Sequence, residues 1–439
     1  MSRSTARLGA VVLAMAAMLA VPGITLAHAI GGTFQLPVPL WLYLAGAAIA
    51  VAASFVLTSI VVRRDEGPAS AYGTRPVSPA LASVLRTGLR ILGLAWWYGA
   101  IAVGFLVGDI SPLPAVLLWV GIWVGLPIVA VLVGNAWPSL SPFRTTFAAL
   151  DWVARRAGAA RLDAGMRYPP GLARWPAVGL LAVGIWAELV LPGSDAAGTV
   201  AWLMLGYTVL TLTGMSLFGQ VAWLRHAELF EVELGWFGRI GPVGRRSVST
   251  ELCDGFGETC DPARCIDCPE CATAADDEER QPILRPWIVG LTDVRRAGWS
   301  DAAFIVLALG GVSYDGMKET AFGASLLSAL LPPVQNVFGL TSTTFLVLDT
   351  LAMILVILAF LAAFVLIAFA AHALADAARR RPLGDTAGVY AATLLPIAGG
   401  YVIAHYLTLV IQGAVWLPSL LVDPLMSLAP ALDWIPTSL

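Results

Sequence analysis

Charged side chains are scarce in this chain, and their scarcity excludes a soluble domain. Asp, Glu, Lys and Arg make up only 13% of the 439 residues, whereas hydrophobic residues make up 58%. A soluble domain carries about 25% charged residues. The net charge of −3 is small and its charges are spread over loops, so we expect no nucleic-acid partner. The composition predicts a polytopic membrane protein whose main partner is the lipid bilayer.

Cysteine is also rare, and all five copies lie in one segment: Cys253, Cys260, Cys265, Cys268 and Cys271. Such clustering is typical of a metal or iron–sulfur loop, because thiolates converge on one ion when the backbone between them is short. The spacing of the second, third and fourth cysteines matches a plant-type 2Fe–2S loop, and any four of the five suit a tetrahedral zinc. We therefore predict zinc or an iron–sulfur cluster here. The alternative is an acidic, disordered loop with free thiols.

The N-terminus has the pattern of a secretory signal peptide, which we assign to residues 1–27. Arg3 and Arg7 precede an apolar run, and Thr25 and Ala27 place small residues where a signal peptidase cleaves. Cleavage after Ala27 makes His28 the first residue of the mature chain. An uncleaved first helix is the alternative.

Eight later stretches are long enough, or nearly so, for the roughly 20 residues that cross a bilayer. The sequence therefore predicts an all-α membrane bundle of about eight transmembrane helices. Five of them belong to a first part at 28–224 and three to a second part at 301–439, with a cysteine-rich loop at 225–300 between the parts. The expected spans are 40–62, 88–108, 114–135, 175–193, 198–224, 301–324, 344–375 and 386–412. Gly310-Gly311 and the Ser-Tyr-Asp-Gly stretch at 313–316 predict an interrupted sixth helix.

Arginine near the ends of these stretches predicts their direction, because basic residues are retained on the cytoplasmic side. Arginines follow the first, third, fifth and seventh stretches, so every second loop is basic. We therefore expect a plasma-membrane protein with its mature N-terminus outside and the cysteine-rich loop in the cytoplasm. Cytosolic thiols are kept reduced, so disulfides are not expected in that loop.

Ionisable side chains inside the expected spans predict an outward-facing site, because a charge at membrane depth is costly and faces a cavity or a partner. Glu188, Asp315, Asp349 and His405 all fall in the outer half, and His28 can reach the same region. Two imidazoles and three carboxylates can hold divalent ions that activate a water, and the amine and imidazole of His28 can chelate copper. The alternative is a set of interhelical hydrogen bonds. Tyr401, Tyr406 and Gln412 accompany His405, with Tyr401 four residues before it on one helix face.

A second polar group is expected near the inner ends of the helices, comprising Asn135, His226, Glu228, His372 and Asp376. We favour ordinary hydrogen bonding at helix ends over a metal site there. The following stretch, 227–240, mixes aromatic and acidic residues. It is typical either of an interfacial helix on the inner leaflet or of an extension of the fifth helix.

Three sequence motifs resemble a family of prokaryotic membrane proteins known as fenitrothion hydrolases. They are His28–Gly32 continuing through Leu36–Leu42, Val312–Gly316, and Ala404–Tyr406. The resemblance implies a membrane-bound enzyme that hydrolyses organophosphorus triesters. If the chain is such a hydrolase, the shared expected depth of the ionisable residues predicts a metal site, with Glu188 as a base or ligand and a metal that generates hydroxide. The expected metal ligands are His28, His405, Asp315 and Asp349.

Two other functions remain open. In the first, His28 captures copper or another metal ion outside, and the chain passes it inward to the cysteines, whose soft thiolates suit Cu(I). In the second, the chain is a non-catalytic membrane subunit whose zinc or iron–sulfur loop docks a protein partner or carries an electron.

Overall fold

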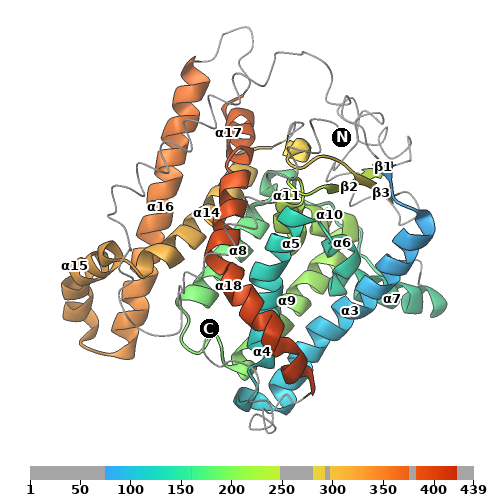
Figure 1. Ribbon diagram of the computed structural model, residues 1–439, viewed down its shortest axis with the longest axis horizontal. Coiled ribbons are helices and arrows are strands. Elements are labelled where there is room, and N and C mark those ends of the chain that lie inside the picture. The colour runs from blue at the N-terminus through green and yellow to red at the C-terminus, as the bar shows by residue number, and fades with distance from the viewer. Residues whose placement is uncertain (1–74, 160, 248–279, 292–296, 375–381, 423–439) are drawn as a thin grey trace, which may run out of the picture.

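The structure is a computed structural model that describes residues 75–159, 161–247, 280–291, 297–374 and 382–422. The predicted signal peptide, the first expected span at 40–62, His28, the five cysteines and Asp376 lie outside these residues. Within the described part the chain is helical apart from one small sheet (Figure 1).

The longer helices are α3 (Pro79–Leu106), α7 (Pro142–Arg156), α8 (Trp175–Leu189), α9 (Ala197–Phe218), α14 (Trp299–Lys318), α15 (Ala321–Phe338), α16 (Ser342–Leu374) and α18 (Leu395–Val422). The shorter ones are η2 (Gly108–Ile110), α4 (Leu113–Ala115), η3 (Val116–Gly125), α5 (Leu126–Leu132), α6 (Trp137–Leu140), η4 (Pro170–Leu172), α10 (Gln220–His226), α11 (Leu229–Phe237), η6 (Val289–Leu291) and α17 (Leu383–Ala392). Helices satisfy their own backbone groups, which a lipid environment requires.

Six helical segments of the described part are long and apolar enough to cross a membrane: Ala80–Leu106, Leu113–Leu132, Ala197–Phe218, Ala321–Phe338, Ser342–Ala373 and Leu383–Val422. This finding confirms a helical membrane protein, without establishing the predicted count of eight. Five of these segments coincide with expected spans over most of their length, and the sixth, Ala321–Phe338, shares only residues 321–324 with one. The expected span at 175–193 corresponds to the shorter apolar helix Trp175–Leu189.

Around residue 320 the structure differs from the prediction. The expected span at 301–324 is divided, because α14 ends at Lys318 and α15 begins after Thr320, whose hydroxyl accepts a hydrogen bond from the Gly323 amide at 3.2 Å. The sequence does not predict α15, which contains Pro332 and Pro333 inside the helix. In Figure 1, α15 and α16 lie together on one side of the molecule, away from α3 and α7.

The predicted interruption of the sixth helix is wrong, since α14 runs without a break through residues 310–316. Its glycines instead allow close packing. A Cβ on Gly311 would lie 2.7 Å from Ile185 of α8, and one on Gly316 would lie 2.3 Å from the Tyr401 hydroxyl of α18. These contacts bring α14 against the two helices that carry Glu188 and His405.

The described part also contains a three-stranded antiparallel sheet, in the order β1-β3-β2. Its strands are β1 (Arg75–Pro76), β2 (Val243–Ser247) and β3 (Arg280–Leu284). Ser247 pairs with Arg280, so the chain leaves β2 and returns to β3 at the same place. No sheet was expected from the sequence.

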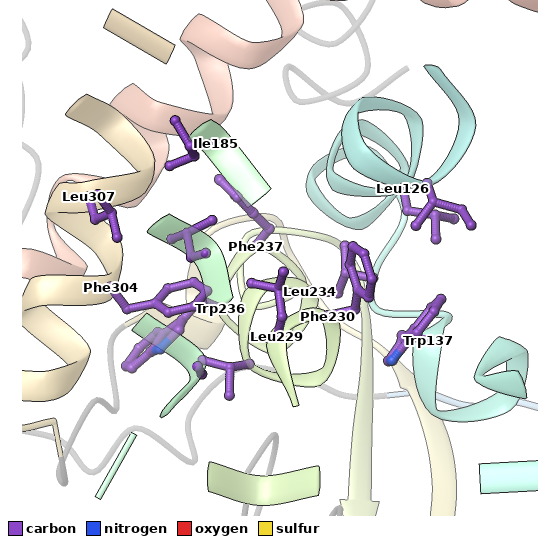
Figure 2. Close-up of a cluster of buried hydrophobic side chains, with 14 of the residues drawn as sticks. Leu126, Trp137, Ile185, Leu229, Phe230, Leu234, Trp236, Phe237, Phe304 and Leu307 are labelled. Atoms are coloured by element: carbon purple, nitrogen blue, oxygen red, sulfur yellow. The ribbon is translucent and has the colours of Figure 1, made fainter. Parts of the chain in front are cut away.

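The short helix α11 lies in the core of the bundle, not on its surface. Eight of its nine residues are buried, Gly235 being the exception. Figure 2 shows Phe230, Leu234 and Phe237 among side chains of α5, α8 and α14. Both expectations for this stretch are therefore wrong. It is no extension of α9, which ends at Phe218 and is followed by Gly219 with a φ of 83°, and its burial does not fit an interfacial helix.

Candidate functional site

Asp315 of α14 is the centre of the polar group that the sequence predicts on the outer side, here called the outer polar group. Its Oδ2 atom lies 3.1 Å from His405 Nε2 and accepts a hydrogen bond from the Tyr406 hydroxyl at 2.7 Å. Asp315 and Tyr406 are both buried. The expected face shared by Tyr401 and His405 is present, with their rings 5.6 Å apart. Two helices distant in sequence thus hold one carboxylate between an imidazole and a phenol.

Glu188 of α8 is a second carboxylate beside this group. Trp123 Nε1 donates a hydrogen bond to Glu188 Oε2 at 2.5 Å. Glu188 also lies close enough to Asp315, Glu233 and Lys318 to interact with them electrostatically. Trp123 belongs to η3, a π-helical segment, and this wide helical geometry is frequent at functional sites.

A narrow cavity connects the outer group to α11. It is lined by Trp123 and Glu188, by Tyr406 of α18, and by Glu233 of α11, together with apolar side chains. Its volume is about 40 Å³. A water molecule needs roughly 10–15 Å³ of such space, whereas small-molecule sites occupy about 300–1,000 Å³. The cavity therefore has room for a few water molecules but none for an organophosphorus triester.

The contact that Asp349 makes near this group is through its backbone and not through the predicted carboxylate. It lies on α16, and its backbone carbonyl accepts a hydrogen bond from the Tyr314 hydroxyl at 3.1 Å. Its carboxylate is not part of the contact between Asp315 and His405. The structure thus brings Glu188, Asp315 and His405 together and places Asp349 beside them.

The described residues do not fit the metal site expected from the sequence. Among them, no group of three or more histidines, cysteines, aspartates or glutamates is placed to hold a metal ion. The Oδ2 atom of Asp315 is already engaged by His405 and Tyr406. Metal binding that involves His28 or the five cysteines stays a prediction, because those residues lie outside the described part.

In the inner polar group, Glu228 is held by four donors. It is the N-cap of α11, and its carboxylate accepts from the Phe230 and Glu231 amides at 3.2 and 2.6 Å. Tyr207 and Trp137 donate to the same carboxylate at 2.5 and 3.0 Å. Burial raises the pKa of Glu228 to about 7, although these donors favour its charged form.

Asn135 also forms a hydrogen bond at a helix end, because its Oδ1 accepts from the amide of Trp137, the first residue of α6, at 2.9 Å. The expected hydrogen bonding at helix ends is thus confirmed for Asn135 and Glu228. His372 lies within α16, far along the chain from both.

Sequence reasoning missed the other two acidic residues of α11. Glu231 forms a buried ion pair with Arg144 at 3.2 Å, and Glu233 lines the narrow cavity. Burial raises the pKa of Glu233 to about 8, and nearby Glu228 adds to that effect. The available signal is three glutamates within six positions of an otherwise apolar stretch, a pattern that equally suits a membrane surface.

His226, at the end of α10, predicts a pH-dependent stability. Burial, with Arg225 and Arg174 nearby, lowers its pKa from 6.5 to about 4. The unfolded chain therefore binds a proton before the folded one does, so the stabilising contribution is complete above pH 6.5 and is lost as the pH falls towards 4. We expect the wild type to lose about 1–2 kcal/mol of its free energy of unfolding in this way, after allowance for partial exposure of the ring. The variant His226→Gln, which cannot bind this proton, should keep that free energy.

Thermal unfolding of the detergent-solubilised protein at pH 7.5 and at pH 5 measures this effect. The wild type should lose more stability than the variant between the two conditions. Equal losses would show that His226 does not titrate as its surroundings indicate.

No protein-family model matches this chain, and no curated protein or solved structure is significantly similar to it.

Proposed function

We propose that this chain moves protons across a membrane. One observation carries the proposal: four carboxylates, Asp315, Glu188, Glu233 and Glu228, form a row from α14 through α8 to α11. Each of them lies close enough to the next to interact electrostatically. Rows of acidic and histidine side chains inside membrane proteins are typical of proton relays.

Charge and space both favour protons over a larger substrate. Adjacent carboxylates in a low-dielectric interior repel one another, and a shared proton relieves that repulsion. Glu228 and Glu233, with pKa values raised to about 7 and 8, exchange protons near neutral pH. The cavity between Glu188, Glu233 and Tyr406 has the volume of a few waters, which can bridge these groups.

The orientation expected from the arginine pattern gives the row a direction. Under that orientation Asp315 and His405 lie towards the outside, and α11 lies nearer the cytoplasm. His405 and Tyr406 then form the outer entrance, and the glutamates of α11 lead towards the inner surface.

Proteoliposomes test this function. They contain the full chain and a trapped pH-sensitive dye, and a potassium gradient with valinomycin sets the membrane potential. We expect proton flux well above that of protein-free vesicles, and at least a tenfold loss of flux in Asp315→Asn, which keeps the side-chain shape but cannot ionise. Glu319→Gln is the matched control, since Glu319 lies exposed at the end of the same helix. Wild-type flux equal to that of empty vesicles would overturn the proposal.

Hydrolysis of organophosphorus esters is the second candidate. It is favoured because Asp315 and His405, which come from two of the motifs that carry the family resemblance, lie in contact at 3.1 Å. A chromogenic aryl phosphotriester, offered to the purified protein with divalent metals, tests it. Turnover that disappears in His405→Ala, without proton flux in the wild type, would favour the hydrolase. Metal-ion transport and a docking role for the cysteines rest on residues outside the described part and stay predictions.

A further inference from the structure

A second and larger cavity lies on another side of α8. It has a volume of about 300 Å³ and is bounded by α3, η3, α8, α9 and α11. Its inner end is formed by the buried Leu229 and Phe230. At its mouth stand Val183 of α8 and Trp202 of α9, which are 59% and 66% exposed. The cavity therefore reaches from the outer surface of the helices to the core of the bundle.

The wall of this cavity is apolar because its aromatic residues direct their polar atoms elsewhere. Trp97 Nε1 donates to Thr208 at 2.8 Å, and Trp119 Nε1 donates to the Ser194 carbonyl at 2.8 Å. The four polar atoms of Trp97, Trp119, Trp123 and Tyr207 are all bonded to the protein. An occupant thus meets ring faces and aliphatic carbons, and its recognition needs no hydrogen bond.

The mouth of the cavity lies on a helix that is able to cross a membrane, and this position indicates where an occupant comes from. Trp202 belongs to Ala197–Phe218, one of the segments able to cross a membrane, and stands on its exposed side. The mouth therefore opens towards hydrocarbon. An empty apolar cavity lacks the dispersion contacts that its lining would make with an occupant, and a hydrocarbon chain from the surrounding lipid restores them without leaving an apolar environment.

We propose that this cavity binds an acyl chain of a bilayer lipid, which enters sideways between Val183 and Trp202. The volume of about 300 Å³ lies at the lower end of the range for small-molecule sites, as suits one hydrocarbon chain without its headgroup. The cavity shares Trp123 and Tyr207 with the row of carboxylates, through their hydrogen bonds to Glu188 and Glu228, but no carboxylate lines it and lipid binding does not depend on proton movement.

Gly206 offers a way to fill the cavity without disturbing the fold. It lines the cavity on α9, and a Cβ built there meets no atom within 4 Å. Gly206→Leu places a branched side chain in the space. Gly179→Leu is the matched control, since Gly179 of α8 also has open space around it and does not line the cavity. Both changes improve helix propensity by a similar amount, so they differ in the cavity alone.

The experiment uses the full chain in nanodiscs of phosphatidylcholine that include a phosphatidylcholine with a photoreactive diazirine in one acyl chain. After illumination, mass spectrometry locates the labelled peptides. We expect labelling concentrated on the cavity residues of α8 and α9, at least fivefold lower in Gly206→Leu and within twofold of wild type in Gly179→Leu. Val183→Phe, which narrows the mouth at an exposed position, should also lower it and serves if Gly206→Leu does not fold.

Two results would overturn the proposal. In one, labelling is no stronger at the cavity than on the exposed face of α16, for example at Leu366 and Ile367. In the other, labelling at the cavity is strong but unchanged in Gly206→Leu and Val183→Phe, which would place the lipid chain outside the cavity.

Discussion

Replacement of Glu228 by alanine is expected to lower the free energy of unfolding by roughly 3–5 kcal/mol. The change leaves four buried donors without their acceptor: two backbone amides at the start of α11, the Tyr207 hydroxyl and the Trp137 indole. Each buried donor left without a partner costs about 1–3 kcal/mol, although neighbouring losses do not simply add. The measurement is reversible unfolding in mixed micelles, followed by tryptophan fluorescence.

Glu228→Gln separates loss of the acceptor from loss of charge. The amide keeps one oxygen for two of the donors but turns an NH₂ group towards the others. We expect it to cost about half as much as alanine. A cost below about 1 kcal/mol for alanine would mean that water replaces the carboxylate and that the start of α11 is not sealed from solvent.

Arg174→Leu is expected to cost roughly 3–5 kcal/mol, because it leaves the buried carboxylate of Asp301 without its cation. The Arg174 guanidinium contacts Asp301 Oδ1, and the two side chains are only 12% and 8% exposed. Arg174 also donates through its backbone amide to Ser300 at 3.2 Å, so the pair joins the start of α8 to the start of α14. Loss of this cation should therefore weaken the helix pair that carries Glu188 and Asp315.

The double variant Arg174→Leu with Asp301→Asn tests whether the cost comes from the unpaired charge. The amide introduced by Asp301→Asn cannot ionise, so we expect the double variant to recover at least half of the stability lost by Arg174→Leu alone. If the double variant is no more stable than the single one, the lost packing of the arginine stem is the cause and the charge is not.

Apolar run length was enough to predict most of the membrane helices, because lipid requires continuous stretches of that kind. It failed at α15, where Pro332 and Pro333 resemble the end of a helix although the structure continues through them. It failed again at α11, whose glutamates suggested a surface. Their burial depends on partners distant in sequence, such as Tyr207 and Arg144, which no local pattern reveals.

The candidate site was predictable in its members but not in its contacts. Expected depth in the membrane grouped Glu188, Asp315 and His405, and the structure places these three together. The same reasoning included the carboxylate of Asp349, which depth alone cannot distinguish from the others. It left out Glu233, since its position depends on how α11 folds back into the bundle.

The pairing of Ser247 with Arg280 has a consequence for the cysteines between them. Directly opposed residues of antiparallel strands have Cα atoms about 4.5–5.5 Å apart, so the segment that carries all five cysteines begins and ends at one narrow neck. The β2–β3 ladder offsets the entropic cost of holding those two ends together. A tight turn of two residues that joined Ser247 to Arg280 directly would therefore keep the same pairing of β2 with β3.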